Sequence, residues 1–329
     1  MNKKDLIEAL KIVQPAVTEQ SLTAQNNLII FNRKTVKAYN DEILITTPIK
    51  VPIKGAVPAK ELFTLLQKIK GDTIKIKQKG NSLEVSNKTT VATLKMEELK
   101  GLKVENTSKW YSLPKDFLKG IDYCKFSLAG QGDVLNNIYI STDKIISCDN
   151  FRITQYIMKD GAFEKDFLIS SSTIEPLITL KPTSFALDNH WIFFKNKNKA
   201  TLYIKRTGAK YPNIKAILNS SNKGTKVKLP KELKDGLLRA KILSEEDTTT
   251  GNNMINITIK DNKLTCYGKC ALGQIEESIK IDYKGKKLSF TIVPDFLIEI
   301  LEMTQTMLVE DSCLIFKTTT LQHRLQLIK

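Results

Sequence analysis

The sequence predicts an α+β protein with three repeats, each an antiparallel sheet with two helices packed on one face. Two observations carry this prediction. Two series of amphipathic segments recur three times at nearly one period, and β-rich runs bounded by turn residues lie between them. The chain of 329 residues is also long enough for two or three domains, each with its own core.

The first helix of each repeat is predicted from apolar residues at positions i, i+3, i+4 and i+7. These residues are Leu6, Ala9, Leu10 and Val13, then Phe117, Gly120, Ile121 and Cys124, then Leu233, Gly236, Leu237 and Ala240. The second helix of each repeat has a shorter stripe. Its members are Leu62, Leu65 and Leu66, then Ile174, Leu177 and Ile178, then Leu297, Ile300 and Leu301.

Strands are expected where β-rich residues precede a turn, as at residues 73–77 and 255–259. Polar segments with Gly, Ser or Asn at residues 100–108 and 219–224 are linker candidates, because the repeat pattern breaks there. The predicted domains are residues 1–107, 108–224 and 225–329.

The charge favours a polyanionic partner. Lys and Arg number 51 against 35 Asp and Glu, a net charge of +16, which suits nucleic acid or a membrane surface. Only five of the basic residues are arginines, so charge alone identifies no partner. No run approaches the roughly 18 to 20 apolar residues of a membrane span, and the first residues do not form a signal peptide. We expect a cytoplasmic protein without a membrane partner.

Metal, cofactor and catalytic signals are weak. Five cysteines and two histidines offer little for a disulfide framework or a zinc site, so we expect reduced thiols and no cofactor. The sequence contains no Gly-rich phosphate loop and no Gly-x-Ser-x-Gly. The acidic groups at 245–247 and 310–311 suggest a metal-dependent nuclease only weakly, because the first is expected in a polar loop and the second is an isolated pair. We predict that the protein is not an enzyme.

Lysine recurs on the predicted first helices. At 100° per residue, Lys4, Lys115 and Lys231 lie about 160° from the apolar stripe. The other far-face positions mix both charges with apolar residues, as in Glu8 and Asp235. A solvated helix surface and a polyanion-binding surface both explain this pattern.

Four short segments, in order on this repeat framework, resemble the bacterial sliding clamp, the β subunit of DNA polymerase III. They are similar to the family's Leu-Asn-Gly, Ala-Thr-Asp-Gly-His-Arg-Leu, Gly-x-Phe-Pro-Asp-Tyr and Arg-Ala-x-Ile-Leu-Ser stretches. In this chain the segments are Leu135-Asn136-Asn137, 147–153, 206–212 and 239–244. The resemblance covers essentially the whole chain.

The chain departs from the family pattern at several positions. Asn150 and Phe151 replace Gly-His, Asn213 and Ile214 replace Asp-Tyr, and residues 325–329 replace a Met-Pro-Met-Arg type of tail. The chain is also shorter and more basic than is usual in the family. We interpret it as a short, divergent member, and a phage or mobile element is the origin we consider for it.

The resemblance implies a head-to-tail ring of two copies that encircles double-stranded DNA and serves as a processivity factor. Its expected partners are a DNA polymerase, a clamp loader and a second copy of the chain. Helices are expected to face the DNA, and the DNA-facing candidates are Lys4, Lys11, Lys115, Lys119, Lys125, Lys231, Lys234, Arg239 and Lys241.

The resemblance also implies a pocket for an extended partner peptide that ends in bulky apolar residues. Its candidates are Leu135, Cys148, Asn150, Phe151, Arg152, Ile153, Pro212, Ala216, Ile217, Leu325 and Leu327. Several of these residues are explained equally well as core. For the dimer interface, Ile242 and Leu243 are expected to meet the strand around Val91 and Leu94 of a neighbouring copy.

Two other functions remain open. A protein with the clamp fold could serve as a tether in repair or transcription, or as a decoy of clamp-binding proteins, and the sequence does not separate these from replication. A basic DNA-binding protein that grips without encircling would carry clustered arginines and aromatic residues at a groove. Arginines are scarce here, and the sequence shows no cluster of aromatic and basic residues.

Overall fold

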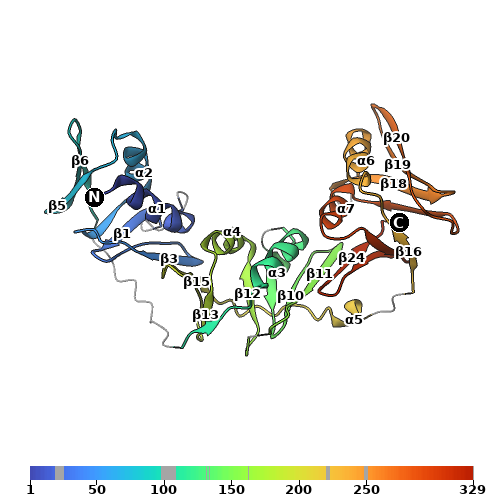
Figure 1. Cartoon of the computed structure of the whole chain (residues 1–329), viewed down its shortest axis with the longest axis horizontal. Helices are drawn as coiled ribbons and strands as arrows, with labels where there is room; N and C mark the ends of the chain where they lie inside the picture. Colours follow the sequence, from blue (N-terminus) through green and yellow to red (C-terminus); the bar gives the residue numbers. More distant parts are fainter. Residues whose placement is uncertain are drawn as a thin grey trace. The chain divides into compact units, whose positions relative to one another are not determined.

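The computed structural model describes residues 1–18, 26–97, 109–130, 132, 134–161, 163–219, 223–247 and 251–328. The chain forms two compact units. Figure 1 labels the helices and strands. The first unit comprises Met1–Leu118 and Asp160–Gly208, and the second comprises Lys119–Lys159 and Ala209–Lys329. The linker candidate at 100–108, and residues 220–222 of the other, lie outside the described residues. The three domain boundaries stay predictions.

The three predicted helix pairs are present in order. They are α1 (Lys3–Val13) and α2 (Ala59–Lys68), α3 (Phe117–Cys124) and α4 (Ser171–Leu180), and α6 (Leu233–Ala240) and α7 (Pro294–Leu301). Every residue of the first-helix stripes is buried, and the second-helix stripes are buried except for half-buried Leu65 and Ile178. The apolar periodicity therefore identified the core face of each helix. None of the described helices has the length and apolar character needed to cross a membrane.

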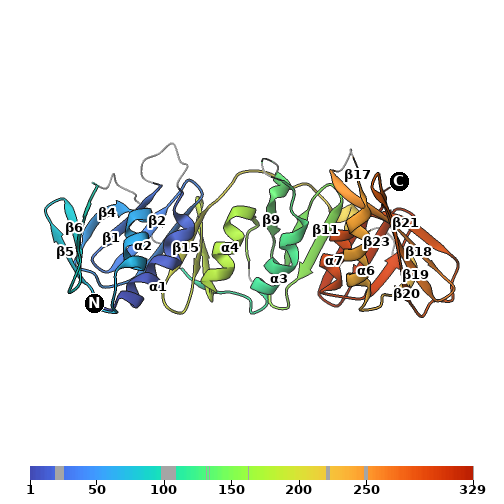
Figure 2. The ribbon, with the colours of Figure 1, turned by 90° about the horizontal axis from the view of Figure 1, so that it is seen from above.

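The first unit contains two antiparallel sheets. Its strands are β1 (Leu28–Asn32), β2 (Thr35–Tyr39), β3 (Ile43–Pro48), β4 (Lys54–Pro58), β5 (Lys75–Lys79), β6 (Ser82–Ser86), β7 (Val91–Lys95), β8 (Tyr111–Ser112), β12 (Phe167–Ser170), β13 (Ser184–Leu187), β14 (Trp191–Lys195) and β15 (Thr201–Lys205). One sheet runs β4-β1-β2-β3-β15-β14-β13-β8, and the other runs β5-β6-β7. Helices α1 and α2 cover one face of the β1–β4 strands (Figure 2).

The second unit also contains two antiparallel sheets. Its strands are β9 (Asn137–Ile140), β10 (Lys144–Cys148), β11 (Arg152–Ile157), β16 (Thr225–Lys228), β17 (Glu245–Asp247), β18 (Asn252–Lys260), β19 (Lys263–Cys270), β20 (Gly273–Lys280), β21 (Leu288–Ile292), β22 (Thr306–Val309), β23 (Cys313–Lys317) and β24 (Leu321–Gln326). One sheet contains the run β9-β10-β11-β24-β23-β22-β16, and the other runs β17-β18-β19-β20 with β21 paired to β18. The predicted strands at 73–77 and 255–259 correspond to β5 and β18.

One loop prediction was wrong. Residues 245–247 form strand β17, in which Glu245 pairs with Met254 of β18. The charged side chains of this strand favoured a loop in the sequence, but pairing with the long strand β18 satisfies its backbone.

Two helices pack closely on strands through a glycine. A Cβ on Gly120 of α3 would lie 2.5 Å from Ile145 Cδ1 and 2.7 Å from a ring carbon of Tyr156. A Cβ on Gly236 of α6 would lie 2.6 Å from Ile279 Cδ1. Glycine costs about 1 kcal/mol in a helix interior. The close approach of helix and strand explains why both repeats keep it at the same position of the stripe.

Candidate functional site

A cavity of about 430 Å³ lies in the second unit, where the turn before β11 meets strands β23 and β24 and the short helix α5 (Lys215–Leu218). Five of the predicted pocket residues line it, namely Asn150, Phe151, Arg152, Ile153 and Ile217. The remaining lining residues are Asp149, Glu310, Ser312, Cys313, Arg324 and Gln326. The cavity therefore combines apolar side chains with both signs of charge.

A small apolar cluster adjoins the cavity at Ile153. Cys148 and Ile153 are buried in it together with Ile214 of the 206–218 segment, and Leu135 packs against them. Tyr211 closes the cluster, since its hydroxyl lies 3.3 Å from Cys148 Sγ, and burial raises the pKa of that hydroxyl. The three carried-over sequence segments thus meet at one place in the fold.

Arg152 is fixed by the elements around it and is only 7% exposed. Its Nε donates to Asp149 Oδ2 at 3.0 Å, and its Nη1 donates to Glu299 of α7. The guanidinium also lies 3.8 Å from the ring centroid of Phe296. Burial raises the pKa of Glu299, and the Arg152 charge opposes that rise. Arg152 therefore lines the cavity and connects it to α7.

A buried polar chain fixes β11 to β24 next to the cavity. Thr154 Oγ1 lies 2.9 Å from His323 Nδ1 and 2.6 Å from Ser127 Oγ. Burial, with a smaller effect of Arg152, lowers the pKa of His323 to about 3, so the ring is neutral at neutral pH. Nδ1 is the ring nitrogen that bonds Thr154, whereas the buried Nε2 has no hydrogen-bond partner among the described residues.

The other predicted pocket residues do not line this cavity. Pro212 and Ala216 are exposed beside it, whereas Leu325 and Leu327 are buried in the core of the second unit. Side chains alternate along a strand, so Arg324 and Gln326 face the cavity while Leu325 faces the core. Sequence reasoning missed these two polar residues, although the alternation of buried Leu321 and Leu325 along the strand would have indicated them.

The DNA-facing candidates lie on or next to the first helices. Two of them are placed differently from the prediction: Lys115 and Lys231 precede α3 and α6 and do not lie on their far faces. The turns at Pro114 and Pro230 explain the difference, because the backbone amides of Phe117 and Leu233 donate to those proline carbonyls before the helices begin. Both lysines are exposed at equivalent points of the two repeats.

Four of the candidates are ion-paired with carboxylates. Lys125 Nζ lies 2.7 Å from Asp122, and Arg239 lies 2.9 Å from Glu277. The other two pairs involve the acidic face of α7 and the residue after it. Lys241 Nζ lies 2.6 Å from Asp295, and Lys234 pairs with Glu302.

The remaining candidates, Lys4, Lys11, Lys115, Lys119 and Lys231, are exposed. The six helices of the three pairs together carry eight basic and eight acidic residues. The positive charge of the chain is therefore not concentrated on its helices.

The interface candidates include two of the most exposed apolar side chains among the described residues. Ile242 is 73% exposed in the turn after α6, and Val91 is 70% exposed at the start of β7. Leu243 and Leu94 are half-buried. Strands β7 and β20 each end the strand order of their sheet.

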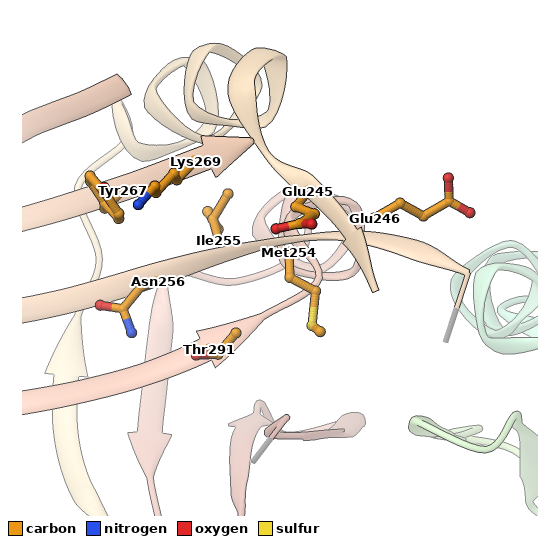
Figure 3. Close-up of a pocket in the computed structure, with 8 residues that line it drawn as sticks. All are labelled: Glu245, Glu246, Met254, Ile255, Asn256, Tyr267, Lys269 and Thr291. Atoms are coloured by element: carbon orange, nitrogen blue, oxygen red, sulfur yellow. The ribbon is translucent and has the colours of Figure 1, made fainter. Parts of the chain in front are cut away.

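A second cavity, of about 390 Å³, lies beside β17 and β18 (Figure 3). Figure 3 shows the carboxylates of Glu245 and Glu246 pointing in different directions, with Tyr267 and Lys269 on the neighbouring strand. No group of three or more His, Cys, Asp or Glu side chains is arranged for a metal ion within the described part of the chain.

No protein-family model and no curated protein sequence matches the chain. Solved structures match it over its whole length. The DNA polymerase III beta chain of Streptococcus pneumoniae gives a TM-score of 0.87 at 16% identity, with 98% of that chain covered. The beta subunit from Thermotoga maritima gives 0.84 at 14% identity, also with 98% covered.

The sliding clamp of Pseudomonas aeruginosa bound to griselimycin gives a TM-score of 0.85 at 16% identity, with 98% of that chain covered. Each of the three matches covers 100% of the present chain. The order of the helix pairs, their buried stripes and these full-length matches agree. The chain has the fold of the bacterial sliding clamps, the beta subunits of DNA polymerase III.

Proposed function

We propose that the protein is a DNA sliding clamp, which encircles duplex DNA as a ring-shaped homodimer and tethers a DNA polymerase. The observation that carries this proposal is the match of the entire chain to sliding clamps of three bacteria, at TM-scores of 0.84 to 0.87. A clamp acts by topology and not by catalysis, in keeping with the prediction that the protein is not an enzyme.

The charge on the helices supports a ring that slides. A protein held by many phosphate contacts binds tightly and loses affinity steeply with salt. Eight basic and eight acidic residues on the six helices give a surface on which no strong grip develops. Exposed lysines such as Lys4, Lys119 and Lys231 then supply transient point-charge contacts without reading base edges.

Ring closure is proposed to join β7 of one copy to β20 of the next. Both are edge strands, and an unpaired strand edge is a template for pairing with another chain. Val91 on β7 and Ile242 next to β20 are largely exposed, and burying one such side chain contributes about 1.5 to 3 kcal/mol. Leu243 would extend this apolar contact, whereas half-buried Leu94 lies on the other side of β7 from Val91 and would border it.

The cavity of about 430 Å³ is proposed as the site for partner peptides. Phe151, Ile153 and Ile217 offer apolar contacts, and Ile217 is 51% exposed, so a ligand can still bury it. The charged residues Glu310 and Arg324 add polar contacts that an apolar pocket would lack. Polymerase and clamp loader are the expected partners, and a tether in repair or transcription, or a decoy, would use the same pocket.

Topological binding is the experiment that tests this function. The protein is incubated with nicked circular plasmid, separated from free protein in high salt, and the plasmid is then cut once. A clamp stays bound to the circle and leaves the linear product, because it slides off the ends. Equal retention before and after cutting would instead indicate a protein that grips DNA.

The lining lysines are tested in the same assay. Replacing Lys4, Lys115 and Lys231 together by Glu is expected to reduce retention on the circle without changing the mass of the assembly. Normal retention of this variant would contradict the assignment of these lysines to the lining.

A further inference from the structure

The positive charge of this protein lies mainly on its strands and loops. The net charge of the chain is +16, whereas basic and acidic residues are equal in number on the six helices of the three pairs. A ring that contacts DNA only through its helices does not account for this excess. Part of the excess positive charge lies on the strands of the first unit.

Five exposed lysines share one face of adjoining strands in the first unit. Lys75, Lys77 and Lys79 alternate along β5 and so point to the same side. Ser82 of β6 pairs with Lys79 on one side and with Lys95 of β7 on the other, which places both lysines on that face. The five lysines, which we call the lysine face, are Lys54, Lys75, Lys77, Lys79 and Lys95.

Lys54 joins this face through a bridge between β4 and the residues after β7. Ala56 and Glu97 form an antiparallel bridge, so the residues two positions before them, Lys54 and Lys95, lie on the same side. Figure 2 shows β5 and β6 beside β4 and β1. The opposite side of the β5-β6-β7 sheet is buried through Ile76, Leu83 and Val85, so the lysine face is the solvent side.

Further basic residues extend the lysine face at the start of β4. Asn32 pairs with Lys54, and the next residues are exposed Arg33 and Lys34. The Arg33 amide donates to the Ile53 carbonyl at 2.8 Å, which holds this turn against the start of β4. Two carboxylates, Glu84 and Glu97, lie on the same side, and Glu84 is paired with Lys79. The charge of this region therefore remains strongly positive.

The chemistry of this surface fits the phosphates of duplex DNA. Side chains on one face of a strand repeat every ~6.7 Å, which is twice the ~3.4 Å axial spacing of phosphates along one strand. The exposed side of β5-β6-β7 consists of Lys, Ser, Thr and Glu, with Val91 as its one apolar residue. It offers no aromatic residue for stacking on single-stranded bases and no apolar pocket to anchor a peptide.

We propose that the lysine face is a second DNA-binding surface, which holds the backbone of duplex DNA by lysine–phosphate contacts on the side of the sheet away from the helices. It is independent of encirclement, so a short duplex with free ends binds it. Its lysines act as point charges, and the binding is weak, independent of sequence and strongly dependent on salt.

The test measures binding of a short, blunt-ended, fluorescent duplex to the full chain over a range of salt concentrations. The variant carries Lys54→Gln, Lys75→Gln, Lys77→Gln and Lys95→Gln. The matched control carries Lys226→Gln, Lys228→Gln, Lys284→Gln and Lys287→Gln, which are exposed lysines of the second unit. Both lose four positive charges, and thermal melting confirms that both are folded.

If all four lysines contact phosphates, the slope of log affinity against log salt falls by about 3.6 in the variant, and affinity at low salt falls at least tenfold. The control is expected to change the slope by less than about 1. Equal slopes in variant and control would overturn the proposal.

Two other results would also overturn it. If the variant changes the mass in sedimentation equilibrium and leaves DNA binding intact, the face is a contact between copies. If poly-glutamate of the same charge binds as tightly as the duplex, the face recognises anionic chains in general. Failure here leaves the plasmid-cutting test untouched, because a ring without this surface still releases linear DNA.

Discussion

The acidic face of α7 is predicted to limit how strongly the helices hold DNA. Asp295 pairs with Lys241 at 2.6 Å and Glu302 pairs with Lys234, so two DNA-facing candidates of the third repeat already have carboxylate partners. The perturbation is the double variant Asp295→Asn and Glu302→Gln. It keeps the size of both side chains and leaves both lysines free to contact phosphates.

The magnitude follows from the number of lysines released. Each new phosphate contact adds about 0.9 to the salt slope, so two contacts steepen it by up to about 1.8. Between about 50 and 200 mM salt, affinity for duplex DNA then falls about tenfold more than in the parent protein. The cost to folding is small, because both pairs are exposed and such pairs contribute about 0.2 to 1 kcal/mol each.

The assay is titration of a fluorescent duplex at several salt concentrations. The control variant carries Asp282→Asn and Asp311→Asn, two exposed carboxylates away from α7. It has the same net charge as the α7 variant, so a general effect of charge appears in both. If the two variants give the same slope, the pairing with α7 does not restrain these lysines, and the reasoning fails.

Three further predictions concern the pocket, the interface and the core. Ile217→Asp should weaken binding of a labelled peptide ending in leucine and phenylalanine about 30- to 1000-fold in fluorescence polarisation, because a half-buried apolar contact is lost and a carboxylate must be desolvated. The control Ile217→Val should bind the peptide nearly as tightly as the parent protein does. If the Asp variant binds as tightly as the parent, Ile217 is not part of the site. Ile242→Asp should shift sedimentation toward monomer, whereas Leu238→Asp, on exposed α6 surface, should not; the same mass for both would contradict the interface. His323 has a folded pKa of about 3, below its ordinary 6.5, so the unfolded chain binds the extra proton between these values. Stability should therefore fall as pH drops from about 6.5 toward 3, by about 1.4 kcal/mol per pH unit from this group. In urea titrations, the unfolding free energy of His323→Gln should fall less steeply with decreasing pH than that of the parent protein. If the two proteins lose stability in parallel as pH falls, His323 is not the group responsible.

The sequence predicted the helices of the fold well because burial of a stripe is a local, periodic property. Gly120 and Gly236 show how far this extends, since they occupy the same stripe position and both allow close packing on a strand. The period does not define where a helix begins, and Lys115 and Lys231 were assigned to helices that start two residues later. The turns at Pro114 and Pro230 set where these helices begin, and the count of 100° per residue takes no account of such turns.

The site was predicted in part because its segments are short and continuous. Residues 150–153 and Ile217 line one cavity as a group. The contribution of β24 was missed because the face of a strand depends on register, and a shift of one residue exchanges Leu325 for Arg324. The pairing of Arg152 with Glu299 could not be predicted from the sequence, since the two residues are 147 positions apart. The same holds for Asp295 of α7 and Glu302 just after it, which pair with Lys241 and Lys234.

Small-angle X-ray scattering with the native mass tests the central claim, a closed ring, most directly. The account predicts a hollow particle of twice the 37.2 kDa chain mass, the size of a closed two-fold assembly. Ile242→Asp is expected to convert it to a particle of the chain mass. A compact monomer in the unmodified protein, at all concentrations measured, would contradict the ring and favour a protein that grips DNA without encircling it.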